Sequence, residues 1–186
     1  MKQFFICLIL ISSLTSFAQK IEFSSEFEAL QDAIGIEIFL PLESDFQSIR
    51  TIKNPYQEYQ AAIRSHKKKL EIRYFFEPYI EENLLTTMPH LQVGRMISSA
   101  ATNDEDAVIA YHEIEQHDLE KFGADWGQMV IFRPKEGFSE QPFCKMVTLF
   151  KENKGTSSVF YLFDDADNSA VDDFYFALKF NSVISR

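Results

Sequence analysis

Two histidines near the middle of the chain, His112 and His117, are of the residue type that most often holds zinc. A zinc-binding helix needs two histidines at positions i and i+4, with a glutamate beside them, so that both rings face one side. Here the histidines are five residues apart. That spacing sets the rings roughly 140° apart on a helix and on opposite faces of a strand. We therefore expect no metal at these residues, and we predict no cofactor for the chain.

The acidic run Asp164-Asp165-Ala166-Asp167-Asn168 resembles the beginning of a calcium-binding loop. Counted from Asp165, an EF-hand requires glycine at the sixth position and glutamate at the twelfth. The sequence has Ala170 and Phe176 at those positions, so an EF-hand is excluded. The expected structure is a solvated acidic turn before the next element. A looser surface calcium site is the alternative.

Cys144 is the one thiol outside the N-terminal apolar segment. A cysteine nucleophile needs a histidine base within hydrogen-bonding reach and a lowered pKa. The chain has four histidines, His66, His90, His112 and His117. No local motif joins any of them to the cysteine. Because the alternation over residues 143–149 predicts a strand, we expect Cys144 to pack against a helix; a thiol-dependent or other hydrolase using Cys144 and a histidine is the alternative.

Three residues are candidates for binding a ligand or a partner: Arg73, Trp126 and Phe132. Arg73 lies among strand aromatics, where an arginine can stack on rings or clamp an anion; its alternative is a solvent-facing position opposite Ile72 and Tyr74. A single tryptophan such as Trp126 is usually a core residue or an interface anchor. We expect some aromatic side chains to form an exposed patch. The sequence has no nucleophile-elbow or glycine-rich phosphate motif, and we predict no catalytic residue.

The composition limits what the elements around these residues can build. The chain has 186 residues, 46% of them hydrophobic, with 18 Lys and Arg against 28 Asp and Glu and a formal charge of −10. Such a length favours one domain, and the apolar content excludes a disordered polymer. A nucleic-acid-binding protein would need a basic face. We therefore predict no nucleic-acid partner.

The N-terminus has the pattern of a secretory signal peptide. Lys2 precedes the apolar run 4–14, and Ser16 and Ala18 supply small residues for cleavage. The run is too short to span a bilayer, which takes about 20 residues. We predict a signal peptide over 1–18 and one globular domain over 19–186. The domain would have no transmembrane segment, and its destination would be the bacterial periplasm, the outer surface or the medium.

Hydrophobic periodicity predicts helices over residues 24–33, 89–102, 118–132 and 167–180. It predicts strands over 36–40, 56–65, 70–78, 108–114, 143–151 and 156–164. Two glycines weaken the helix over 118–132, and a last strand is the alternative for 167–180. Charged residues 65–69 and the turn Asn153-Lys154-Gly155 join two pairs of strands into hairpins. Because hairpins impose antiparallel pairing, we predict an α+β fold with an antiparallel sheet of about five to six strands and helices packed on it.

This layout resembles the Mog1/PsbP-like group of α/β/α sandwich proteins. The resemblance is carried by the strand ending Phe39-Leu40-Pro41, the hairpin closing with 70–76, the helix from Pro89 and the hairpin ending with 159–164. The chain also resembles secreted bacterial proteins with a similar Ala124-Asp125-Trp126-Gly127 segment. The resemblance implies an α/β/α sandwich and a binding or accessory role through docking to other proteins. It carries over no catalytic residue.

Together these features predict an exported envelope protein that is not catalytic and that binds a partner protein or a ligand. One alternative is the hydrolase that would use Cys144. Another is a structural or stress-related secreted protein.

Overall fold

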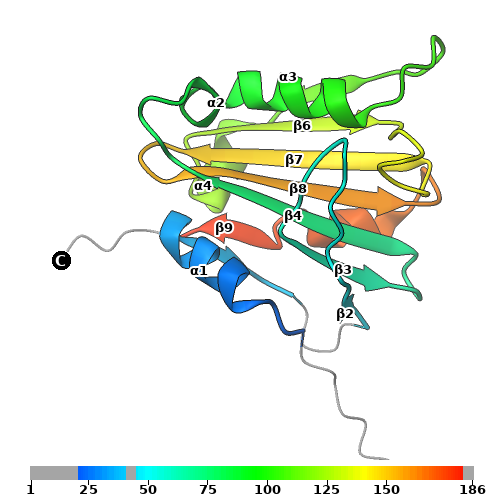
Figure 1. Cartoon of the computed structure of the whole chain (residues 1–186), viewed down its shortest axis with the longest axis horizontal. Helices are drawn as coiled ribbons and strands as arrows, with labels where there is room; N and C mark the ends of the chain where they lie inside the picture. The colour runs from blue at the N-terminus through cyan, green and yellow to red at the C-terminus, as the bar shows by residue number, and fades with distance from the viewer. Residues whose placement is uncertain (1–20, 41–44, 182–186) are drawn as a thin grey trace, which may run out of the picture.

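The computed structural model describes residues 21–40 and 45–181 (Figure 1), so the predicted signal peptide over 1–18 lies outside the described residues. The first half of the chain forms α1 (Ser25–Ile34), β1 (Ile36–Ile38), β2 (Gln47–Ser48), β3 (Ala61–Ser65), β4 (Leu70–Pro78), α2 (Leu84–Thr87) and α3 (Pro89–Ala100). The second half forms β5 (Ala110–Glu113), α4 (Gln116–Phe122), β6 (Trp126–Phe132), β7 (Phe143–Lys151), β8 (Gly155–Phe163), the 3-10 helix η1 (Ser169–Phe174) and β9 (Leu178–Phe180).

The main sheet has seven antiparallel strands in the order β2-β3-β4-β8-β7-β6-β5. Its long central strands β4, β8 and β7 run side by side through the molecule (Figure 1). The predicted α+β class with an antiparallel sheet is confirmed. The predicted strand number was too low because residues 126–132 form β6 and the two residues Gln47 and Ser48 add a short edge strand.

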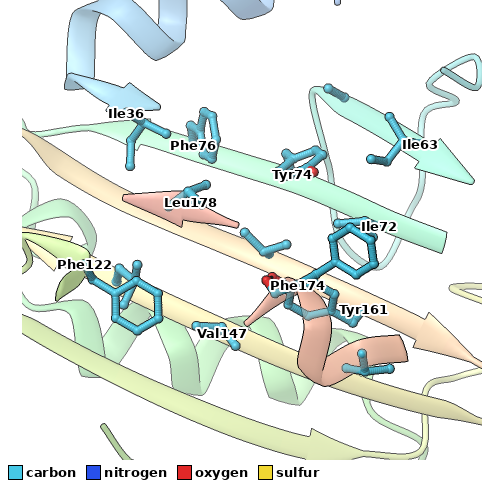
Figure 2. Close-up of a cluster of buried hydrophobic side chains, with 14 of the residues drawn as sticks. Ile36, Ile63, Ile72, Tyr74, Phe76, Phe122, Val147, Tyr161, Phe174 and Leu178 are labelled. Carbon is cyan, nitrogen blue, oxygen red and sulfur yellow. The ribbon is translucent and has the colours of Figure 1, made fainter. Parts of the chain in front are cut away.

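Side chains of β4 alternate between the two faces of this sheet, as the strand period of two requires. Ile72, Tyr74 and Phe76 join a first hydrophobic cluster with α1, α4, η1 and β9. Figure 2 shows this cluster, with side chains from β4, β8, η1 and β9. Phe75 joins a second cluster with α3, β6, β7 and β8. The residues of β4 that alternate with Ile72, Tyr74 and Phe76 therefore lie on the face that α3 covers.

The helix predicted over 24–33 is confirmed as α1. The Ser24 side chain accepts a hydrogen bond from the backbone N–H of Phe27, and Gly35 ends the helix in the left-handed conformation at φ 69°. Both features are standard helix signals. Both predicted hairpins are also confirmed, as β3–β4 and β7–β8. The helix predicted over 89–102 is α3, and the strand over 108–114 is β5.

The single helix predicted over 118–132 was wrong. The helix α4 ends at Phe122, because Gly123 takes the left-handed conformation at φ 64°. A Cβ at Gly123 would lie 2.8 Å from the carbonyl oxygen of Phe180, so the close approach of β9 also requires glycine. The chain then turns into β6, which pairs with β7 and β5.

The helix predicted over 167–180 was correct only at its beginning. Asn168 caps η1 by accepting from the backbone N–H of Ala170 at 3.1 Å. The chain leaves the helix after Phe174 and forms β9, which pairs with β1 in a separate two-stranded ribbon. No helix among the described residues is long and apolar enough to cross a membrane.

Candidate functional site

A cleft of about 620 Å³ lies between the segment 53–60, the end of β4 and the helices α2 and α3. We call it the β4 cleft. Its volume falls within the range of about 300–1,000 Å³ that small-molecule sites occupy. The residues that line it and carry the argument below are Lys53, Tyr56, Gln57, Glu58, Phe75, Glu77, Leu85, Arg95 and Ser99.

The segment 53–60 is held in place by side chains that bond to backbone. Asn54 accepts from the N–H groups of Tyr56 and Gln57 at 2.9 and 3.3 Å, and its Nδ2 donates to the carbonyl of Gly137 at 3.1 Å. The amide of Gln60 pairs with the backbone of Phe76 on β4, accepting at 2.8 Å and donating at 3.0 Å. The outer wall of the cleft is thus fixed to the sheet and does not depend on a ligand for its shape.

Gln57 is the buried polar residue of this wall, with 3% of its surface exposed. Its Nε2 donates to the carbonyl of Glu58 at 2.9 Å. Its Oε1 has no hydrogen-bond partner among the described residues. A buried carbonyl oxygen without a donor costs about 1–3 kcal/mol. This oxygen is itself enclosed by protein atoms, so it lies behind the wall and does not face the open space of the cleft.

Glu77 lies at the end of β4, half-buried, where Nε2 of the fully buried Gln92 on α3 donates to its Oε2. Burial raises the pKa of Glu77 above its usual value, and the positive charge of Arg95 offsets part of that rise. The register places Thr156 of β8 opposite Glu77. Oγ1 of Thr156 and Oε1 of Gln92 also have no partner among the described residues. The hydroxyl of Thr156 can donate as well as accept, whereas Oε1 of Gln92 can only accept.

Charged groups of the opposite sign lie at the rim of the cleft, where Lys53 and Arg95 are exposed. Tyr56 and Leu85 add apolar surface. The hydroxyl of Ser99 donates to the carbonyl of Tyr56, so it serves to hold the wall. The β4 cleft thus combines a half-buried carboxylate, exposed cations and an aromatic wall.

A second cleft of about 390 Å³ lies between β7 and the segment 166–172. Three of its polar side chains, those of Lys145, Asp172 and Asn168, already have partners. Lys145 forms an ion pair with Asp172 at 2.9 Å. Asn168 donates to the carbonyl of Lys68 at 3.0 Å and also caps η1. Because these side chains are already bonded, we favour the β4 cleft over the second cleft as the candidate ligand site.

Arg73 is buried, with 7% of its surface exposed, on the face of β4 opposite Ile72 and Tyr74. Its Nε donates to Glu71 at 2.6 Å and its Nη1 to the carbonyl of Phe138 at 2.6 Å. The guanidinium also lies 4.7 Å from the ring centre of Tyr59 and 4.9 Å from that of Phe138. The face is covered, so the solvent-facing alternative was wrong. Arg73 stacks on rings and clamps an anion, but the anion is the protein's own Glu71.

The two aromatic candidates lie at opposite ends of β6. Phe132 is 2% exposed in the second hydrophobic cluster, so it contributes to the core and to no exposed patch. Trp126 is half-buried and packs against the same cluster. The strands β7 and β8 separate both residues from Arg73 on β4. The structure does not bring the three candidates together, and a binding role for each stays a prediction.

Cys144 is fully buried in the second cluster, and burial raises the pKa of its thiol well above the usual range. All four histidines are exposed. The hydrolase alternative required a partly exposed thiol beside an imidazole, and the structure supplies neither condition. His112 lies on β5 and His117 on α4. Within residues 21–40 and 45–181, no three His, Cys, Asp or Glu side chains gather as a metal site would require.

Sequence reasoning missed Gln57, Glu77 and Arg95. The alternation of β4 was a usable signal for Glu77, because it places Glu77 on the same face as Arg73 and Phe75. The strand predicted over 56–65 was correct only from Ala61, where β3 begins. Its alternation put Gln57 on the buried face with Tyr59 and Ala61, but it did not indicate that Gln57 would lie beside a cleft. Comparison with known proteins finds no matching family model, no matching curated protein and no matching solved structure.

Proposed function

We propose that this chain is an exported, non-catalytic binding protein that holds a small polar molecule in the β4 cleft. The observation that carries the proposal is the half-buried carboxylate of Glu77 in the cleft, with the exposed cations Lys53 and Arg95 in the same lining. Sites for small molecules combine apolar walls with a few placed polar groups. Glu77 and Arg95 are such groups, and Phe75 and Leu85 add apolar surface.

The polar groups of the cleft are suited to recognition. Glu77 supplies acceptors, and Arg95 supplies donors and positive charge. The single aliphatic hydroxyl among the lining residues, that of Ser99, is engaged by a backbone carbonyl. Recognition without chemical change is the simplest use of this arrangement.

Export and family membership belong to the same proposal. The signal-peptide pattern over 1–18 supports a periplasmic or secreted location. The Mog1/PsbP-like resemblance supports an α/β/α sandwich in which a binding or accessory role is expected. Helices on both faces of an antiparallel sheet agree with that architecture.

A protein partner in the envelope is the second candidate. Four large apolar side chains are exposed between β4 and the first half of α3: Ile80, Leu84, Met88 and Leu91. Exposed apolar side chains that gather in one region often mark an interaction site. These four residues flank Leu85 in the sequence, and Leu85 lines the β4 cleft. A partner bound to them could therefore cover the entrance to the cleft. A structural or stress-related secreted role would need neither the β4 cleft nor this apolar surface.

The test is a ligand screen by NMR on the full-length chain, expressed in a bacterium and purified as the cell processes it. ¹⁵N-labelled protein would be mixed at millimolar concentration with amino acids, amines, sugars, nucleosides and carboxylic acids. We expect at least one class to shift the amide signals of residues 53–60, 77 and 95 in a saturable manner. If no compound shifts these signals, the proposed function is wrong.

A pair of neighbouring substitutions controls this screen. Leu85→Trp would fill part of the cleft, and it should weaken binding of any ligand found there. Leu84→Trp places the same side chain on an exposed neighbour outside the cleft lining. It should leave binding unchanged. Equal binding by both variants would contradict the placement of the ligand.

A further inference from the structure

We infer that the ligand of the β4 cleft carries an ammonium group and an acidic group, as free amino acids and the ends of short peptides do. The inference rests on the proposed function and names the class of ligand. In this arrangement the ammonium group lies against Glu77. The acidic group faces Arg95 and Lys53 at the rim.

The first step concerns what the inner wall can bond. Glu77 is a carboxylate whose Oε2 accepts from Gln92, and its Oε1 remains as a second acceptor. An ammonium group has three donors and no acceptor. It fits a wall that presents acceptors, and it supplies the charge that a half-buried carboxylate requires.

The second step concerns the charges at the rim. Together with Glu77 they argue against a ligand that is only a cation and against one that is only an anion. A ligand that is only a cation would face the positive charges of Arg95 and Lys53 at the entrance. A ligand that is only an anion would meet the carboxylate of Glu77 inside. A ligand with both charges satisfies both ends. Arg95 suits a carboxylate especially well, because the guanidinium can donate two parallel hydrogen bonds.

The third step concerns the body of the ligand. Phe75 and Leu85 line the cleft between the polar groups, and Tyr56 stands on its outer wall. These surfaces take an aliphatic or aromatic side chain, whose burial contributes about 25 cal/mol per Å². The formal charge of −10 on the whole chain also favours ligands that are not strongly anionic.

Three probes of one shape separate these requirements: leucine, 3-methylbutylamine, which lacks the carboxyl group, and 4-methylpentanoate, which lacks the amine. Binding to the purified full-length protein would be followed by NMR titration. We expect leucine to bind at least about tenfold more tightly than either analogue, because each analogue loses one charge-assisted contact. The dipeptide Leu-Leu distinguishes a free amino acid from a peptide, since the two charges are farther apart.

Two variants, Glu77→Gln and Arg95→Gln, test which residue binds each charge of the ligand, and Glu58→Gln is the control. Glu77→Gln keeps the shape and the contact with Gln92, and it should weaken leucine binding about tenfold or more. Glu58→Gln removes an exposed carboxylate of the same cleft and should change the affinity by less than about threefold. Arg95→Gln should weaken leucine while leaving 3-methylbutylamine as it was or tighter. The amide spectrum of each variant would show that it is folded.

The outcomes separate the inference from the function on which it rests. If sugars or nucleosides shift the cleft signals and no amino acid, peptide or amine does, the β4 cleft is a binding site and the inference is wrong. If leucine binds equally well with Glu77→Gln and with Glu58→Gln, the ammonium position is wrong. If nothing shifts these signals, the proposed function itself fails.

Discussion

Burial controls the chemistry of two ionisable side chains on the face of the sheet that α3 covers. Cys144 is enclosed between β6 and β8, where the aromatic and aliphatic side chains around it exclude water. Glu77 lies at the end of β4 and is only half-buried. In both cases the low-dielectric surroundings disfavour the charged form and raise the pKa. The consequences differ because only Glu77 borders a cleft.

Cys144 should be unreactive in the folded protein. Alkylation requires a thiolate that can reach the reagent, and the raised pKa and full burial remove both conditions. At pH 8 we expect iodoacetamide to label native Cys144 at least about a hundredfold more slowly than the same protein in guanidinium. The measurement is the mass of the intact chain over time. Rapid labelling under native conditions would reveal local opening and would restore thiol chemistry as an option.

Glu77 should make the stability depend on pH. Because its pKa is raised in the folded state, the folded protein holds this proton more tightly than the unfolded chain. The free energy of unfolding therefore falls as the pH rises from the unfolded pKa through the folded one. Glu77→Gln removes this dependence. We expect the stability of the variant, relative to the native chain, to increase between about pH 4 and pH 7.

Guanidinium unfolding at several pH values measures this difference in stability. The comparison requires that the slope of the unfolding free energy against denaturant concentration is the same for both proteins. Glu58→Gln serves as the control, because Glu58 is an exposed carboxylate of the same cleft. A constant difference across the pH range would mean that Glu77 is not buried enough to matter.

At the scale of elements, Arg73 connects the sheet to two segments outside it. Tyr59 comes from the segment before β3, and Phe138 from the connection between β6 and β7. Glu71 binds Arg73 on one side and Arg64 on the other. The same carboxylate thus makes one ion pair that is buried and one whose arginine is 40% exposed. The two arginines therefore allow a matched comparison of the buried ion pair with the more exposed one.

Arg73→Gln should reduce the free energy of unfolding by about 3 kcal/mol or more, because it removes a buried ion pair and leaves the carbonyl of Phe138 without this donor. Arg64→Gln should cost less than Arg73→Gln, because the Arg64 side chain is 40% exposed and Arg73 still pairs with the buried Glu71. Chemical unfolding of both variants tests the comparison. Hydrogen exchange should also become faster around Tyr59 in Arg73→Gln. Equal costs would show that the buried pair does not stabilise the loops.

The elements that could be predicted are those whose signals are local. The turn Asn153-Lys154-Gly155 and the caps Ser24 and Gly35 act within a few residues, and the corresponding hairpin and helix were predicted correctly. β9 was missed, because residues 178–180 become a strand only by pairing with residues 36–38. The β4 cleft was missed for the same reason. It forms where residues 53–60 meet α3, and no pattern within either segment encodes that contact.

At the scale of the whole molecule, the net charge bears on the proposed ligand class and the proposed location. The chain has ten more acidic than basic residues, with 28 against 18. Outside the cytoplasm such a surface is repelled by anionic lipids and nucleic acids, and it attracts cationic groups. Amino acids and peptides are also available to a protein in the periplasm or the medium. The proposed ligand class and the proposed location therefore support each other.

The proposed export gives the last prediction. The apolar run 4–14 resembles the core of a signal peptide, and a charge placed inside the run would break the apolar stretch that defines such a core. Expressed in a bacterium, the full chain should appear outside the cytoplasm with Gln19 as its first residue, as N-terminal sequencing and fractionation would show. Leu10→Arg should leave the uncleaved chain in the cytoplasm, whereas Lys2→Arg, which keeps the positive charge, should be exported normally. An intact native chain in the cytoplasm would remove the envelope from the proposal while leaving the β4 cleft to be tested by itself.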